Sequence, residues 1–203
     1  MSTQAWFSIP LYVTKASGEV YDEIQEELLL CCNQKEFSQF ENWPDHNHEL
    51  SENAFGGNVL KDCPKFLDFL HVNLMSYLDD IGCQSSREYE ISTSWFTKTK
   101  HLKCADLHDH GGSDLSGVYY LQTNGRDGNL KFSDPHRSYA TNYIFQSVTN
   151  CDPKLPLEEG LLALWPGMIQ HQTEPNMTQD VRISLSFNLS FRIRKDDPNF
   201  IFR

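Results

Sequence analysis

Two histidines flank one aspartate in the middle of this chain, within residues 105–121, which read ADLHDHGGSDLSGVYYL. If residues 106–110 are extended, Asp106, His108 and His110 share one face, because the side chains of a strand alternate with a period of two. Two imidazoles about 6.5 to 7 Å apart along a strand can converge on one metal ion. The ion needs a further ligand, for which His171 is the best candidate. Ordinary surface or core histidines are the alternative.

A second group of polar residues begins eleven positions after His171. Residues 181–191 alternate almost perfectly between apolar and polar side chains. The polar face consists of Arg182, Ser184, Ser186, Asn188 and Ser190. An arginine offers a rigid fork that suits a carboxylate, and Ser184 points the same way and can donate to the same group. The alternative is an exposed strand face whose arginine forms a surface salt bridge.

Residues 21–32 and 62–81 are predicted to be helices that brace a sheet and carry no chemistry. The first helix places Ile24, Leu28, Cys31 and Cys32 on one face. In the second, Asp62 is a candidate N-cap, Pro64 lies in the first turn and Gly82 ends the helix. Its apolar stripe is Leu67, Leu70, Leu74, Tyr77, Leu78 and Ile81. Between the helices, His46 and His48 form another H-x-H, which we interpret as part of a solvated loop.

From Tyr89 onward the pattern is that of short β-strands. The predicted strands are 90–96, 117–121, 129–132, 161–165 and 181–191, with turn residues between them. This pattern is typical of an antiparallel sandwich or barrel. Since the chain has neither a repeat nor a convincing linker, we expect one domain, 1–203, with helical support in 1–88 and a barrel core in 89–203.

Composition narrows the range of partners. The 203 residues include 17 Lys and Arg against 28 Asp and Glu, a formal charge of −11, which argues against nucleic acid or anionic membranes as partners. The six cysteines form no C-x-x-C pair and are predicted to be mostly reduced, buried thiols. With neither a signal peptide nor an apolar run long enough to span a membrane, the sequence predicts a cytoplasmic protein.

The order of these motifs resembles the double-stranded β-helix oxygenases that use Fe(II) and 2-oxoglutarate. Residues 95–191 are most similar to a family of such oxygenases found in bacteria and marine phages. Its H-x-H and L-S-G-V-Y-Y appear at 108–110 and 115–120, and its D-P at 134–135. Its G-x-L-x-x-(F/W)-P ahead of a histidine appears at 160–166, and its R-I-S-x-(S/A)-F-N at 182–188.

The resemblance implies a mainly β fold with supporting helices, a jelly-roll or cupin-like barrel braced by the N-terminal helices. His108, His110 and His171 would hold Fe(II), whereas Arg182 and Ser184 would bind the far carboxylate of 2-oxoglutarate. Tyr119 or Tyr120, together with Asn188, would line the pocket. The implied reaction uses O2 to hydroxylate an unidentified substrate and releases succinate and CO2, in the cytoplasm of a bacterium or a phage-infected host.

One position departs from the wider superfamily, whose first motif is H-x-D: here His110 stands in place of the carboxylate. A three-histidine site carries one less negative charge than the two-histidine, one-carboxylate triad of such oxygenases. The missing carboxylate could come from Asp106 or Asp134, which we rank above Asp109 because the side chain of Asp109 should face away.

Two other functions stay open. One is a cupin-like metalloenzyme with a three-histidine site that needs no 2-oxoglutarate. The other is a non-catalytic β-barrel binding module with residual histidines. Trp165 is predicted to be a core residue, and the loop 136–157 a lid.

Overall fold

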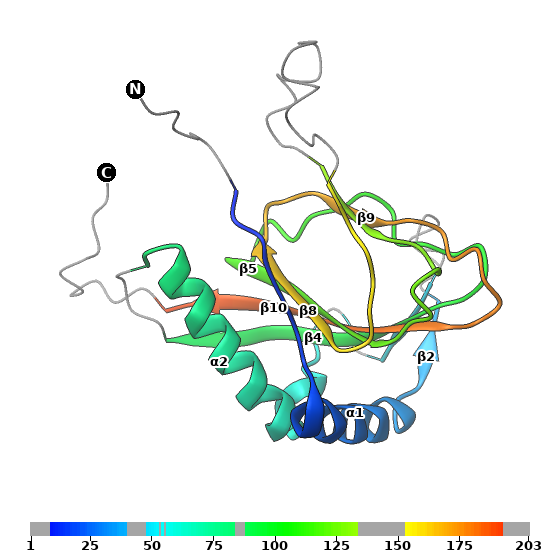
Figure 1. Ribbon diagram of the computed structural model, residues 1–203, viewed down its shortest axis with the longest axis horizontal. Coiled ribbons are helices and arrows are strands. Elements are labelled where there is room, and N and C mark those ends of the chain that lie inside the picture. The colour runs from blue at the N-terminus through cyan, green and yellow to red at the C-terminus, as the bar shows by residue number, and fades with distance from the viewer. Residues whose placement is uncertain are drawn as a thin grey trace, which may run out of the picture.

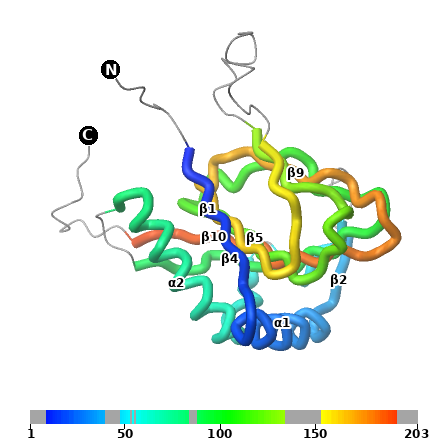
Figure 2. Tube along the Cα trace, in the orientation of Figure 1, coloured from blue at the N-terminus to red at the C-terminus, as the bar shows by residue number. Residues whose placement is uncertain are grey.

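The computed structural model describes residues 9–39, 48–52, 54, 56–83, 88–133 and 153–192. Within these ranges two helices, α1 (Gly18–Asn33) and α2 (Pro64–Asp80), precede most of the strands, and a short 3-10 helix, η1 (Val59–Asp62), leads into α2. No helix of the described residues is long and apolar enough to cross a membrane. The architecture is mainly β with supporting helices, as predicted (Figures 1 and 2).

The larger sheet has seven strands, and every neighbouring pair in it is antiparallel. Its order is β1 (Tyr12–Lys15), β8 (Leu161–Pro166), β5 (Leu115–Gln122), β10 (Arg182–Phe191), β4 (Tyr89–Thr99), β3 (Glu49–Ser51) and β2 (Phe37–Ser38). The smaller sheet consists of β7 (Lys154–Leu155), β6 (Leu130–Phe132) and β9 (His171–Thr173).

Both faces of the larger sheet are buried, which explains the continuous apolar run of its central strands. Tyr119 and Leu121 of β5 join the core formed with α1 and α2, whereas Val118 and Tyr120 join a second core with residues of the smaller sheet. The helices lie along one face of the larger sheet and the smaller sheet lies across the other (Figure 1). The interior between the two sheets is therefore where polar side chains can form a site.

The N-terminus of α2 is capped by the other helix, and not by Asp62 as predicted. Asp62 belongs to η1, and the N-cap residue Cys63 makes no side-chain capping bond. Instead, the carboxylate of Glu27 in α1 accepts hydrogen bonds from the backbone N–H groups of Lys65 at 3.1 Å and Phe66 at 2.9 Å. A long-range contact thus satisfies donors that the first turn of a helix leaves unpaired.

The prediction that Ile81 belongs to the apolar stripe of α2 is wrong. Ile81 lies past the last helical residue, as the C-cap, and is 45% exposed. Phe66 completes the buried face in its place. Gly82 follows with φ of +70°, a left-handed conformation suited to a residue that ends a helix. Of the five described cysteines, Cys32 and Cys63 are buried and the other three are partly exposed.

We predict that Glu27→Ala destabilises the protein by about 1 to 2 kcal/mol, because it removes both capping bonds at the start of α2. Chemical denaturation measures the free energy of unfolding. The matched control is Glu26→Ala, an exposed position on the same helix. Equal stability of the two variants would show that the Glu27 contact contributes nothing.

Candidate metal and cosubstrate site

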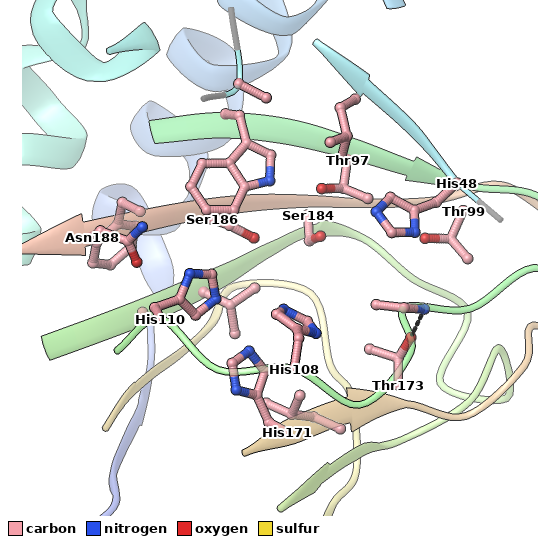
Figure 3. Close-up of a pocket in the computed structure, with 18 of the residues that line it drawn as sticks. His48, Thr97, Thr99, His108, His110, His171, Thr173, Ser184, Ser186 and Asn188 are labelled. Carbon is pink, nitrogen blue, oxygen red and sulfur yellow. Dashed lines mark hydrogen bonds between the residues drawn. The ribbon is translucent and has the colours of Figure 1, made fainter. Parts of the chain in front are cut away.

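Three histidines from two separate segments meet between the sheets. His108 forms an antiparallel bridge with His171, the first residue of β9: each backbone N–H donates to the other's carbonyl, at 3.0 Å and 2.8 Å. His110 follows, and its backbone N–H donates to the Gly167 carbonyl at 2.8 Å. One ring nitrogen of each histidine lies within 4.8 Å of those of the other two (Figure 3). The arrangement is that of three potential ligands to one metal ion.

Gly167, in the turn between β8 and β9, permits this close approach. A Cβ atom there would collide with the Ser113 carbonyl and lie 2.9 Å from the His110 carbonyl. Only glycine lets the chain after His110 pack directly on this turn.

Backbone carbonyls fix the orientation of two of the rings. The Nδ1 atom of His108 lies 2.6 Å from the Asp106 carbonyl, and that of His171 lies 2.9 Å from the Ile169 carbonyl. Because a carbonyl can only accept, each Nδ1 carries a proton, which leaves Nε2 as the ring nitrogen that can bind a metal. Such a hydrogen bond to the second ring nitrogen typically orients a metal-binding histidine.

Burial keeps two of the rings neutral. It lowers the pKa of His171 to about 3, and the neighbouring His108 adds to this effect. Burial, again with a contribution from His108, lowers the pKa of His110 to about 4. Neutral imidazole is the form that binds metals, so near pH 7 both rings are ready to do so.

Two tryptophans flank the cluster. The His110 ring lies 5.9 Å from that of Trp95, and the edge of Trp165 meets His171 at 4.8 Å between ring centroids. Trp165 is buried in the second core, as predicted, and also lines the site. These rings pack beside the imidazoles and restrict their movement.

The histidines open on a cavity of about 280 Å³, whose walls include the polar face of β10. The lining residues of this face are Arg182, Ser184, Ser186 and Asn188. Tyr120, and not Tyr119, lines the same cavity, because Tyr119 faces the helices and packs 5.3 Å from Phe66. The volume suits a small ligand, since pockets for drug-sized molecules begin at about 300 Å³.

Arg182 is a buried cation at one end of this cavity, only 2% exposed. Its Nη1 donates to the Asp127 carbonyl and its Nη2 donates to Thr173 Oγ1 at 3.0 Å. Among the described residues, no carboxylate lies within salt-bridge distance of it. A buried charge is costly unless it is paired, so the geometry favours an anionic ligand here.

Among the described residues, the carboxylates considered as metal ligands do not belong to the histidine cluster. Asp106 is not part of the cluster; its carboxylate lies 3.8 Å from the Cys104 thiol. The expected alternation does not reach it, because residues 105–107 form no regular strand and His108 makes only an isolated bridge. Asp109 is exposed on the cavity wall and accepts from the Gly111 N–H at 3.1 Å. Asp134 and most of the predicted lid lie outside the described residues.

His48 lies outside any helix or strand, but the interpretation of it as part of a solvated loop is wrong, because its side chain is buried. His48 is 9% exposed, lines the cavity, and has Nδ1 at 3.1 Å from the Cys104 carbonyl. It immediately precedes β3, which pairs with β4 and brings this residue inward. Strands as short as β2 and β3 carry too little alternation to reveal this. His46 lies outside the described residues.

Sequence reasoning also missed Trp95 and Thr173, which both line the cavity. Thr173 had a usable signal, because it stands two residues after His171 and therefore on the same strand face.

We predict that His171→Ala weakens binding of Fe(II) or Mn(II) by at least about 100-fold, since loss of a ligand should cost more than loss of its outer-shell partner. Anaerobic titration with the metal measures this. His71→Ala, an exposed substitution on α2, is the control and should bind as the wild type does. Equal affinity of the His171 variant would exclude this cluster as the metal site.

Comparison with known proteins gives one family match. The model of the family described as "Putative 2OG-Fe(II) oxygenase" matches residues 93–188, which contain all three histidines and Arg182. A search of curated proteins gave no match.

Solved structures resemble the whole described fold. An oxidoreductase of the 2OG-Fe(II) oxygenase family from Burkholderia pseudomallei is 11% identical, with 88% of this chain and 84% of that chain covered and a TM-score of 0.60. A Pseudomonas putida prolyl-4-hydroxylase is 10% identical, with 91% and 94% covered and a TM-score of 0.61. HygX from Streptomyces hygroscopicus, with nickel and 2-oxoglutarate bound, is 11% identical, with 90% and 83% covered and a TM-score of 0.59. The chain therefore has the double-stranded β-helix fold.

Proposed function

We propose that this chain, which belongs to the family of 2OG-Fe(II) oxygenases, is a dioxygenase that hydroxylates its substrate and converts 2-oxoglutarate to succinate and CO2. The observation that carries the proposal is that three convergent histidines and the buried Arg182, which has no carboxylate partner among the described residues, line one cavity. 2-Oxoglutarate binds the metal at one end and carries a carboxylate at the other. An enzyme that uses it therefore needs a metal site and an anion site in the same cavity.

His108, His110 and His171 would hold the Fe(II). The donor set fits this ion, because imidazole nitrogen is a suitable ligand for iron and the carbonyls of Asp106 and Ile169 already orient two of the rings. When bound, iron together with 2-oxoglutarate supplies the activation of O2 that the side chains cannot. The protein's part is to orient both, and to keep water away with the Trp95 and Trp165 rings.

Arg182 would bind the far carboxylate of 2-oxoglutarate, with Ser184 and Tyr120 beside it. A guanidinium has five N–H donors, of which described residues, Asp127 and Thr173, occupy two, so within the described part of the chain a fork remains for a ligand. Burial raises the pKa of Tyr120 to about 12, which keeps its phenol protonated as a donor at pH 7. The donors at this end therefore match a carboxylate.

Asn188 lies at the opposite side of the site from Thr173 (Figure 3). Its Oδ1 accepts from Ser116 at 2.9 Å, and its Nδ2 donates to Thr93 at 3.0 Å. The amide keeps one N–H and one lone pair for a ligand. We assign it to the wall that faces the substrate, away from the Arg182 end.

A second candidate function, a three-histidine metalloenzyme that uses no 2-oxo acid, is favoured by one observation: the described cluster holds three imidazoles and no carboxylate. It leaves the buried Arg182 without a role. The two functions differ in whether oxygen consumption requires 2-oxoglutarate.

We predict that the Fe(II)-loaded protein slowly forms succinate from 2-oxoglutarate even without substrate, because oxidative decarboxylation can proceed uncoupled. Succinate and oxygen are measured together, with a metal-free sample as the control. Absence of any 2-oxoglutarate binding by an iron-loaded, oxygen-free sample would refute the proposal, and oxygen use independent of 2-oxoglutarate would favour the second candidate.

We predict that Arg182→Ala raises the Kd for 2-oxoglutarate about 100-fold, because it removes charge-assisted bonds worth about 1.5 to 3 kcal/mol each. Mn(II) affinity should stay unchanged. The matched control is Arg192→Ala, which removes an exposed arginine paired with Glu90 just past β10. Unaltered 2-oxoglutarate binding in the Arg182 variant would contradict its assignment.

A further inference from the structure

Two thiols lie together where α1 meets the start of α2, and neither belongs to the cavity lining. Cys31 is in the last turn of α1, and Cys63 is the N-cap residue of α2. Their Sγ atoms donate to the same acceptor, the Val59 carbonyl, each at 3.6 Å. The two side chains also lie within hydrogen-bonding distance of each other. Two cysteines from separate elements therefore face each other across this junction.

The two thiols differ in their access to solvent. Cys31 is partly exposed, so a small solute can reach its sulfur, whereas Cys63 is 0% exposed. Burial, together with the neighbouring Cys31, raises the pKa of the Cys63 thiol, which therefore stays protonated near pH 7. Cys31 is thus the thiol that an oxidant reaches first, and Cys63 is the second thiol behind it.

Cys63 is a better disulfide partner for Cys31 than the adjacent Cys32 is. Side chains at neighbouring helix positions do not face each other, and Cys32 belongs to the buried face of α1. A disulfide brings its sulfur atoms to about 2.05 Å. Cys63 makes no side-chain capping bond, so turning its sulfur toward Cys31 breaks only the weak S–H bond to Val59.

We propose that Cys31 and Cys63 are a peroxide-sensitive dithiol, which forms a disulfide between α1 and the N-cap of α2. The Cys31 thiolate attacks one oxygen of hydrogen peroxide, the O–O bond breaks, and hydroxide leaves, so that Cys31 becomes a sulfenic acid. The Cys63 sulfur then attacks the Cys31 sulfur, the S–O bond breaks, and the hydroxyl leaves with the Cys63 proton as water. Two thiols and one peroxide give one disulfide and two waters, and a small dithiol reverses the oxidation by exchange.

The disulfide would fix both ends of the segment between the helices. This segment includes β2 and β3, and its residues His48, Leu50 and Ala54 line the cavity. The same junction contains the capping contact of Glu27, which precedes Cys31 by one helical turn and lies on the same helix face. A crosslink that closes a long loop restricts the unfolded chain, so oxidation should stabilise the folded protein.

The test treats the Mn(II)-loaded protein with hydrogen peroxide, because Fe(II) would itself consume the peroxide. Two of the six thiols should be lost from each chain, and peptide mapping without reduction should find residues 31 and 63 crosslinked within one chain. A dithiol should restore both thiols. The crosslink should be absent from Cys31→Ser, whereas Cys104→Ser, which removes a partly exposed cysteine elsewhere, should retain it.

Chemical denaturation gives a second measurement. The midpoint of unfolding should rise when the wild type is oxidised, and it should not rise in Cys31→Ser. Oxidation should also recover part of the stability lost in Glu27→Ala, because both contacts join α1 to the start of α2.

Three results would overturn the proposal. They are oxidation of Cys31 alone to a sulfinic or sulfonic acid, a disulfide that joins Cys31 to another cysteine or to a second chain, and retention of both thiols in a large excess of peroxide. The crosslink mapped in the wild type decides the outcome even if a serine variant does not fold. Neither measurement needs 2-oxoglutarate or turnover, so the result is independent of the proposed function.

Discussion

The site depends on the backbone pairing of His108 with His171. This antiparallel bridge attaches the segment before β5 to the edge of the smaller sheet and fixes the two rings 4.4 Å apart between centroids. The same line of backbone bonds continues from Thr173 to Ala105 and from Asn176 to Lys103. It holds one wall of the cavity opposite β10. Without this pairing, neither the ligand cluster nor the contact between Thr173 and Arg182 would form.

The two ends of the cavity suit ligand groups of opposite charge. At one end, burial makes neutral histidines that can take up a cation. At the other end, a guanidinium is buried without a carboxylate from the described chain. A ligand that binds the metal at one end and carries an anionic group at the other would interact favourably with both ends of the cavity. The protein's overall charge of −11 does not oppose this, because local donors in a cavity outweigh distant, screened surface charges.

The sequence was most informative where one physical constraint acted over many residues. The alternation of β10 extends over ten residues with both sheet faces buried, so the cavity-facing positions from Arg182 to Asn188 could be read directly. His48 could not, because its placement depends on strands of two and three residues. The capping of α2 by Glu27 joins positions 38 apart or more, which no local pattern reveals. The expected role of Asp106 required a regular strand that the chain does not form there.

In the proposed enzyme, one cavity holds a metal on three histidines and a dicarboxylate between that metal and Arg182. A crystal structure of the Mn(II)-loaded protein with 2-oxoglutarate, grown without oxygen, tests this most directly. We expect Mn(II) to be bound by His108, His110 and His171, with the far carboxylate of the cosubstrate on Arg182. A metal bound elsewhere, or a cosubstrate whose far carboxylate makes no contact with Arg182, would contradict it.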